Sequence, residues 1–88
     1  MKSQLTDDFI ACFARLPEEV KESARKAYKL WRDDHRHPSL RFKKIHSQES
    51  VYAVRITRGW RALGLLEGDT ITWFWIGSHA DYEKLIAM

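Results

Sequence analysis

The stretch VYAVRITRGWRALGLLEGDTITWFWI, residues 51–76, decides the fold. Large apolar side chains at 52, 54 and 56 alternate with Ala53 and Arg55, and glycine-containing breaks follow at 57–59 and 67–69. A period of two is typical of strands, and short glycine-containing breaks are typical of hairpin turns. The stretch therefore predicts an antiparallel sheet of three main strands, at 52–56, 60–66 and 70–76. The third is mostly apolar on both faces, which favours an interior position.

The residues after this stretch predict a short C-terminal helix. Gly77-Ser78 marks the expected end of the third strand, and apolar residues then recur at helical spacing in 79–86. We expect the helix to turn three side chains inward, namely Tyr82, Leu85 and Ile86.

The residues before the stretch predict one more strand. Leu40 and Phe42 alternate with two cations, which again gives a period of two. We expect the apolar pair on the core face, and Arg41 and Lys43 on the opposite, open face. The polar residues 47–50, SQES, are expected to form the turn that leads into the next strand.

Two helices are predicted ahead of the strands. Thr6 followed by Asp7 and Asp8 marks the start of the first, because such side chains accept hydrogen bonds from free N–H groups and suit the helix dipole. Pro17 followed by two glutamates opens the second, which we expect to end near Asp33. A short strand near residues 2–6 is expected at the sheet edge. The expected inward-facing residues are Phe9, Ile10, Phe13 and Leu16, then Val20, Ala24, Ala27 and Trp31.

Helices followed by a run of strands predict a two-layer α+β fold. In it, two N-terminal helices pack on a small antiparallel sheet and a short C-terminal helix follows. The 88 residues fit a single domain, residues 1–88, and a hydrophobic content of 44% excludes a disordered chain. No run approaches the ~20 apolar residues of a membrane helix, and no signal peptide is apparent. We therefore expect a cytoplasmic protein with no membrane partner.

The residue types that bind metals and cofactors form no recognisable motif. Cys12 is the only cysteine, which excludes an internal disulfide and a zinc site built from cysteines; we expect it to be packed. The four glycines are isolated from one another, which excludes a glycine-rich phosphate loop. We expect His35, His37 and His46 to be solvated loop residues rather than zinc ligands. The sequence thus predicts no metal and no cofactor.

The basic residues suggest a polyanionic partner. Lys and Arg total 15 against 12 acidic residues, and the net charge of +3 permits a nucleic-acid partner. Arginines neutralise phosphates and aromatic rings stack on unpaired bases. Two interpretations stay open: an RNA-contacting sheet face, or ordinary solvated charges above tryptophans that belong to the core. The cations concerned are Arg41, Lys43, Lys44, Arg55, Arg58 and Arg61, and the interleaved aromatics are Tyr52, Trp60, Trp73 and Trp75.

Three motifs follow one another from the second strand to the last helix. They are Tyr52-Ala53-Val54-Arg55-Ile56, Trp60-Arg61-Ala62-Leu63 and Ile76-Gly77-Ser78-His79-Ala80-Asp81-Tyr82. HPSL precedes them at 37–40, after the two expected helices. In this pattern the sequence resembles the RelE/ParE superfamily of bacterial type II toxin–antitoxin toxins, over about residues 5–86.

The resemblance implies a RelE-like fold and a small antitoxin partner that covers the active face. In one branch of the superfamily it implies metal-independent cleavage of mRNA on the ribosome. It implies that Lys43 or Lys44 contacts phosphate, that Arg55 and Arg61 stabilise the transition state, and that His79 and Tyr82 transfer protons or stack on bases. The candidate residues are therefore, for catalysis, Arg61, His79 and Tyr82, and, for nucleic-acid binding, Arg41, Lys43, Lys44, Arg55, Arg58 and Trp60.

The sequence also departs from the superfamily's pattern. Ala53 stands where arginine is common, Trp60 replaces a tyrosine, and Ala80 follows His79 in place of arginine or tyrosine. Three functions stay open: a ribosome-dependent mRNA endonuclease, a non-catalytic ParE-like toxin that binds and poisons a topoisomerase, and a non-toxic RelE-fold binding module. Arg61 together with His79 favours the first, because cleavage needs positive charge at the phosphate and groups that move protons. The departures favour the other two.

Overall fold

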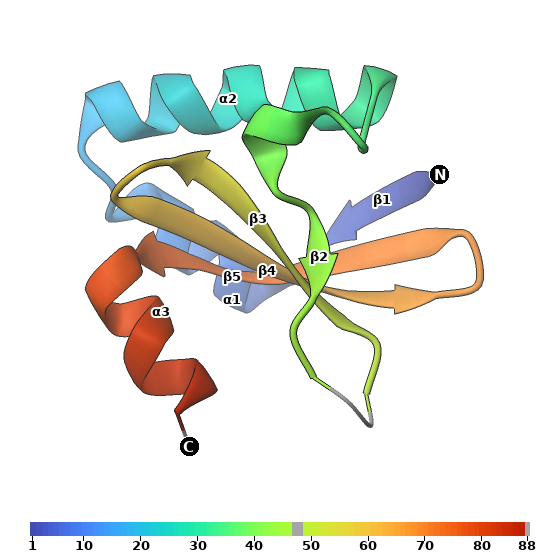
Figure 1. The fold of residues 1–88 in the computed structure, drawn as a ribbon. Coiled ribbons are helices and arrows are strands. Elements are labelled where there is room, and N and C mark those ends of the chain that lie inside the picture. The colour runs from blue at the N-terminus through green and yellow to red at the C-terminus, as the bar shows by residue number, and fades with distance from the viewer. Residues whose placement is uncertain (47–48, 88) are drawn as a thin grey trace.

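The computed structural model describes residues 1–46 and 49–87, in which helices cover a twisted five-stranded sheet (Figure 1). This confirms the α+β fold, the two N-terminal helices and the C-terminal helix. The elements, in chain order, are β1 (Lys2–Leu5), α1 (Asp7–Ala14), α2 (Glu18–Asp33), the 3₁₀ helix η1 (Pro38–Leu40), β2 (Lys43–Lys44), β3 (Val51–Thr57), β4 (Trp60–Glu67), β5 (Thr70–Ser78) and α3 (His79–Ile86).

The strands lie in the order β1-β5-β4-β3-β2. The β2–β3, β3–β4 and β4–β5 pairs are antiparallel, as predicted, and β5 is an interior strand. The expected strand near residues 2–6 is present as β1, but it runs parallel to β5, with Lys2 opposite Thr70 and Leu5 opposite Trp73. The sheet is therefore mixed, with the predicted antiparallel strands and one parallel pair at the β1 edge. A parallel pair needs a long connection, which here contains both N-terminal helices and three strands.

The two N-terminal helices begin as their sequence signals predict. The Thr6 side chain accepts a hydrogen bond from the Phe9 N–H at 3.0 Å and so caps α1. Pro17 occupies the position just before α2 without a side-chain capping hydrogen bond, and α2 ends at Asp33. Ile10 was expected to face inward but is 54% exposed. The reason is that α1 packs on β5 through Phe9, Cys12 and Phe13, and Ile10 lies on the other side of the helix.

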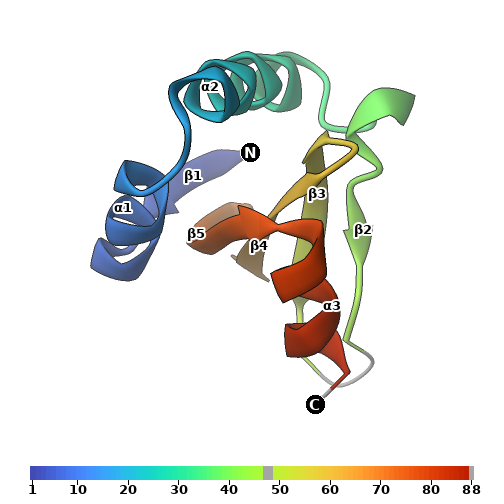
Figure 2. The ribbon, with the colours of Figure 1, turned by 90° about the vertical axis from the view of Figure 1, so that its left-hand side faces the viewer.

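The sheet has a packed core on each face, and Figure 2 shows α2 and α3 on opposite sides of it. The helix-layer core, beneath α1 and α2, contains all four residues predicted for the inner face of α2. The α3 core, on the other face, has three buried residues: Ala53, Leu63 and Tyr82. The buried residues of the helix-layer core are Leu16, Val20, Ala24, Ala27, Trp31, Leu40, Val54, Ala62, Ile71, Trp73 and Ile76.

Local structure departs from the prediction just before the sheet. The strand expected over 40–43 is wrong at its start, because Pro38 opens η1 and Arg41 adopts a left-handed conformation at φ 46°. Leu40 is nevertheless buried and Arg41 exposed, so the expected faces hold. The predicted turn at 47–50 includes residues 47–48, which lie outside the described residues.

The C-terminal end of the sheet departs from the prediction in two ways. β5 does not end at Gly77 but continues to Ser78, which then caps α3. Tyr82 is buried as predicted, whereas Leu85 and Ile86 are 39% and 42% exposed. Leu85 and Ile86 line an open groove together with Val51 and Leu63 of the sheet, so they face the sheet but stay partly exposed.

A β-bulge in β5 changes which side chains reach the α3 face. Leu63 lies opposite Trp75 but Gly64 lies opposite Trp73, which leaves Phe74 as the extra residue. Phe74 and Trp75 therefore both pack on the α3 core, although they are adjacent in the chain. The bulge is close-packed at Gly64, where an added Cβ would lie 2.7 Å from Ile71 Cγ1.

Candidate active site and nucleic-acid interface

Three arginines gather on the α3 face where β3 and β4 turn. Arg55 lies directly opposite Arg61 in the antiparallel pair, and Arg61 in turn lies opposite Gly77 of β5. Alternation along β3 and β4 puts both side chains on the same face as Ala53 and Leu63. Arg41 also lies close enough to act electrostatically on Arg61.

The β3–β4 turn holds the Arg61 guanidinium in place. Its Nη1 donates hydrogen bonds to the backbone carbonyl oxygens of Thr57 at 2.6 Å, Arg58 at 3.2 Å and Trp60 at 3.0 Å. All three bonds use one nitrogen, so they leave Nε and Nη2 available to the two oxygens of a phosphate. The turn thus pre-positions a planar anion-binding group.

The electrostatics of this cluster favour an anion. Burial lowers the pKa of Arg61, and the neighbouring charge of Arg55 lowers it further. Arg41 acts in the same direction, while Tyr82 and Glu83 oppose the shift. Arginine stays charged at physiological pH, so burial first, and then repulsion from the neighbouring cations, makes the Arg61 charge energetically costly. A bound phosphate would relieve that repulsion.

His79 and Tyr82 lie at the start of α3, beside the same turn. The His79 N–H donates to the Gly59 carbonyl at 2.7 Å, which ties the helix to the β3–β4 turn. His79 Nε2 lies 3.2 Å from Oε1 of Glu83, and its ring centroid is 5.8 Å from that of Tyr82. The carboxylate and the imidazole are therefore within ion-pairing distance of each other on adjacent turns of α3.

Tyr82 brings a protonated phenol to the site. Burial raises its pKa above the ordinary value of 10.0, the charge of Arg61 opposes that shift, and Glu83 adds to it. The phenol therefore stays neutral at physiological pH and serves as an O–H donor rather than as a base.

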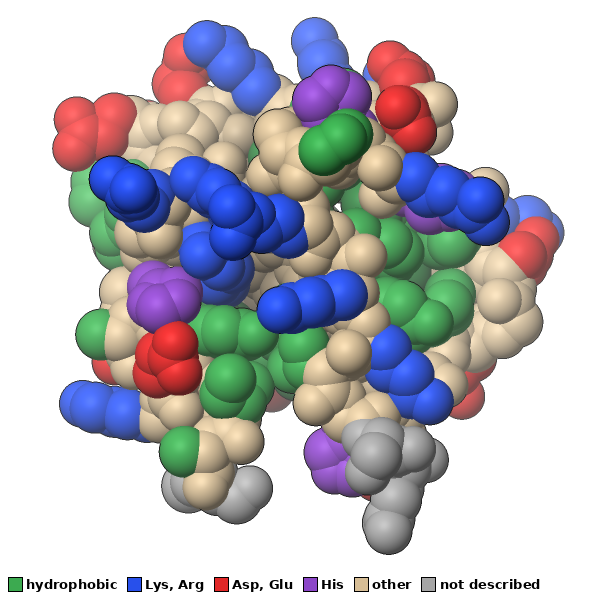
Figure 3. Space-filling model, viewed as in Figure 1, with side chains coloured by type: hydrophobic (Ala, Val, Ile, Leu, Met, Phe, Trp, Pro, Cys, Tyr) green, Lys and Arg blue, Asp and Glu red, His purple; other side chains and the backbone are tan. Residues whose placement is uncertain are grey.

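The structure brings most of the predicted site residues together, but not all of them. Arg41, Arg55, Arg61, His79 and Tyr82 share one neighbourhood, and Arg58 lies in the turn that holds Arg61. Figure 3 shows Lys and Arg side chains gathered over this end of the sheet, above α3.

The remaining predicted residues, two lysines and one tryptophan, do not all lie on the face of the arginines. Lys43 lies opposite Ala53 and so shares the α3 face, whereas Lys44 lies opposite Tyr52, which packs on the helix-layer core. Trp60 also packs on the helix-layer core, away from the arginines. Of the four interleaved aromatics, only Trp75 reaches the arginine face.

The structure adds Glu83 and Trp75 to the site. Glu83 has a signal in the sequence, because it follows His79 by four residues within the predicted helix, and such residues are neighbours on a helix surface. The indole of Trp75 lies against Gly77, where an added Cβ would be 2.5 Å from Trp75 Cζ2. Since Gly77 lies opposite Arg61, the indole is beside the cluster.

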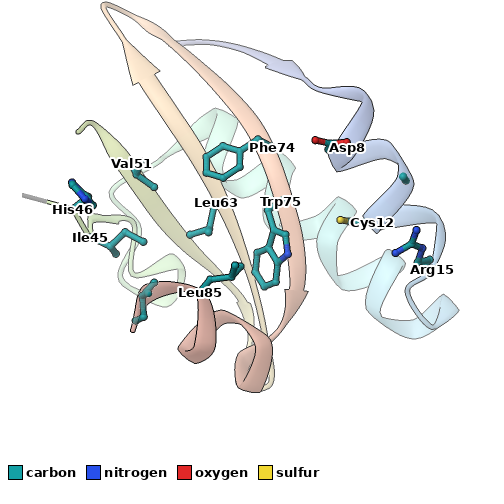
Figure 4. Close-up of a pocket in the computed structure, with 12 residues that line it drawn as sticks. Asp8, Cys12, Arg15, Ile45, His46, Val51, Leu63, Phe74, Trp75 and Leu85 are labelled. Carbon is teal, nitrogen blue, oxygen red and sulfur yellow. The ribbon is translucent and has the colours of Figure 1, made fainter. Parts of the chain in front are cut away.

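An apolar groove of about 560 Å³ continues from the site toward α1. Figure 4 shows Leu63, Phe74 and Trp75 projecting from the sheet on the side of Ile45 and Leu85. Among the described residues, no group of three or more His, Cys, Asp or Glu side chains is arranged to hold a metal ion. No described helix is long and apolar enough to span a membrane.

Comparisons with known proteins agree with this architecture. The sequence profile of the ParE-like toxin domain matches residues 18–84. No curated protein matches the sequence. Among solved structures, the RelB–RelE antitoxin–toxin complex from Methanococcus jannaschii contains a chain that matches with a TM-score of 0.75 and 14% identity, over 93% of this chain and 96% of that one.

Two further solved structures are similar. YafQ from E. coli matches with a TM-score of 0.74 and 8% identity, over 92% of this chain and 96% of that one. The YoeB/ParE toxin from Agrobacterium tumefaciens matches with a TM-score of 0.69 and 13% identity, over 90% and 99% of the two chains. At such low identity these matches show the RelE-like fold alone, and they confirm it.

Proposed function

Because the chain belongs to the family of ParE-like toxin domains, we propose that it is the toxin of a toxin–antitoxin pair and cleaves mRNA on the ribosome without a metal ion. The observation that carries the proposal is the convergence of Arg61, His79 and Tyr82 on one face of the sheet, beside two more arginines. This set supplies positive charge for a phosphate together with two groups that exchange protons near it.

In the proposed reaction the RNA 2′-oxygen attacks the adjacent phosphorus and displaces the 5′-oxygen of the next nucleotide. His79 accepts the 2′-hydroxyl proton, and Glu83 stabilises the imidazolium that forms. Arg61 stabilises the charge that develops on the phosphate oxygens. The Tyr82 O–H donates a proton to the departing oxygen, so a 2′,3′-cyclic phosphate and a free 5′-hydroxyl result.

The resemblance implies an antitoxin that covers the active face, and a second groove, on the other side of the sheet, offers exposed apolar side chains to a further antitoxin segment. Leu5, Ile10 and Tyr28 are 52%, 54% and 40% exposed around a cavity of about 530 Å³ between β1, α1 and α2. Arg25 and Lys29 line the same cavity. We propose that an acidic amphipathic segment of the antitoxin binds there, because it would bury the apolar surface and pair with the cations.

Induced expression followed by mapping of mRNA ends tests the proposed activity. Growth arrest with cleavage of ribosome-bound mRNA, and none of free mRNA, supports a ribosome-dependent endonuclease. Growth arrest without new mRNA ends contradicts it, as does the absence of any arrest.

A second candidate function is the poisoning of a topoisomerase, which the ParE-like profile over residues 18–84 favours. A supercoiling assay with purified gyrase distinguishes the two functions. Inhibition of supercoiling by the purified chain, with intact mRNA in expressing cells, would favour this second candidate.

A further inference from the structure

A third cavity lies behind the edge of β3, between α2 and η1, with a volume of about 420 Å³. Its volume is within the range of small-ligand pockets, roughly 300–1,000 Å³. Leu30 and Ile56 give it an apolar floor. The site described above does not include this cavity.

The polar groups that line this cavity suit a phosphate. Lys26 supplies a cation, Arg55 lies at the strand edge of the cavity with its side chain on the α3 face, and Ser39 and Thr57 add hydroxyl groups. No acidic side chain is among the described residues that line it. Cations, hydroxyls and backbone N–H groups are the usual partners of nucleic-acid phosphates.

Arg55 connects this cavity with the arginine cluster. It lies opposite Arg61 in the sheet and also lines the cavity. The strand outside it, β2, pairs only with Tyr52 and Ala53, so β2 does not cover the outer edge of β3 at Arg55. A strand of RNA at Arg61 therefore meets continuous positive charge from Arg61 through Arg55 to Lys26.

We propose that this cavity binds one nucleotide of the RNA that lies across the arginine cluster, with its phosphate on Lys26 and its base against the apolar floor, and that Arg55 contacts the neighbouring phosphate on the α3 face. The inference rests on the proposed function for the identity of the strand. Unpaired RNA bases splay out and pack on protein surfaces, which a cavity with an apolar floor and a cationic rim accommodates.

Binding of a labelled short single-stranded RNA to the full chain tests this proposal. We expect Lys26→Ala to weaken binding about fivefold and to reduce the slope of log affinity against log salt by about 0.7, the value for one lost phosphate contact on a single strand. Lys21→Ala is the matched control: Lys21 lies on the same helix, where it pairs with Glu18 and lines neither groove, so it should leave the slope unchanged. Equal effects of the two substitutions would overturn the proposal.

A titration with AMP, followed through backbone amide resonances, tests the cavity without any cleavage. Shifts at Ser39 and Thr57 that disappear in Lys26→Glu support the site, and shifts confined to other residues overturn it. These readouts separate the two hypotheses: a chain that cleaves normally but binds RNA without Lys26 loses only this inference. A chain that binds through Lys26 but does not cleave loses only the proposed endonuclease. If Lys26→Glu abolishes antitoxin binding and leaves RNA binding intact, the cavity takes an acidic protein segment and the proposal is wrong.

Discussion

The two faces of the sheet come from the same strands but differ in what they bury. On the helix-layer side, Trp31 and Trp73 are 2% and 4% exposed. Their rings pack edge to face, with 5.4 Å between the ring centroids. On the α3 side, the part of the chain that the structure describes contributes three buried residues, and arginines occupy the neighbouring positions. Because alternate residues face opposite ways, one face stabilises the fold while the other is available for chemistry.

The largest effect is expected when a buried side chain of the helix-layer core is removed. Trp31→Ala removes a buried ring that contacts Phe42 and Trp73, and should lower the free energy of unfolding by about 3–5 kcal/mol. Urea denaturation measures this change. Tyr28→Ala, at an exposed ring on the same helix, should cost about 1 kcal/mol. Similar losses for the two variants would show that the helix-layer face is not the main source of stability.

The next largest effect concerns the proposed cleavage reaction on the α3 face. Arg61→Ala should slow mRNA cleavage by about 10²–10³-fold, because it removes charge that stabilises the transition state. The cleavage rate is compared with that of Arg36→Ala, an exposed arginine in the loop after α2. Circular dichroism checks that both variants fold. Undiminished cleavage by a folded Arg61→Ala protein would remove Arg61 from the mechanism.

A smaller effect is expected from a substitution beside the β5 bulge, which determines the side chains that β5 presents to each face. Gly64→Ala would place a Cβ 2.7 Å from Ile71 Cγ1 and 2.8 Å from Trp73 Cε3, so we expect a loss of about 1–3 kcal/mol in unfolding free energy. Gly59→Ala meets nothing within 4 Å and should change stability by less than about 0.5 kcal/mol. A tolerated Gly64→Ala would mean that the packing around the bulge relaxes readily.

The smallest effect concerns the pH dependence of the α3 core. The pKa of Tyr82 is raised by burial, so folding favours the protonated phenol. As the pH rises through the ordinary pKa of 10.0, the phenol ionises in the unfolded chain before it ionises in the folded chain. The stability that the protonated phenol contributes is therefore lost progressively between pH 10.0 and the raised pKa of the folded state. Melting temperatures from pH 8 to about 11 should therefore fall less steeply for Tyr82→Phe than for the natural chain. Parallel curves would show that the phenol does not titrate differently in the folded state.

Most of the fold was predictable because local patterns determine it. The apolar stripe of α2 and the turns at Gly59 and Gly68 lie where the sequence places them, and Gly68 has the positive φ of 63° that favours glycine. The direction of β1 was not predictable, since four alternating residues carry no information about their distant partner. The 3₁₀ helix at Pro38 also depends on burial of Leu40, which is a tertiary contact.

The candidate site was predictable only in part. Arg55 and Arg61 face the same way because hairpin register follows from the turn between them, and His79 and Tyr82 follow from the helix boundary. Trp60 was assigned to the nucleic-acid surface, but it directly precedes Arg61 in β4, and the structure packs it on the other face. Alternation along the strand accounts for this placement, because neighbouring side chains point to opposite faces of a sheet.

The parallel pairing of β1 with β5 has a consequence for the order of synthesis. Lys2 and Thr70 are partners although almost the whole chain separates them. Contacts between such distant residues form slowly, because the intervening loop must close first. During synthesis β1 is made before β5, so β1, and α1, which packs on β5, stay without this partner until β5 is made. A chain whose translation stops before Trp73 therefore lacks the strand that pairs with β1 and with β4 beside Arg61.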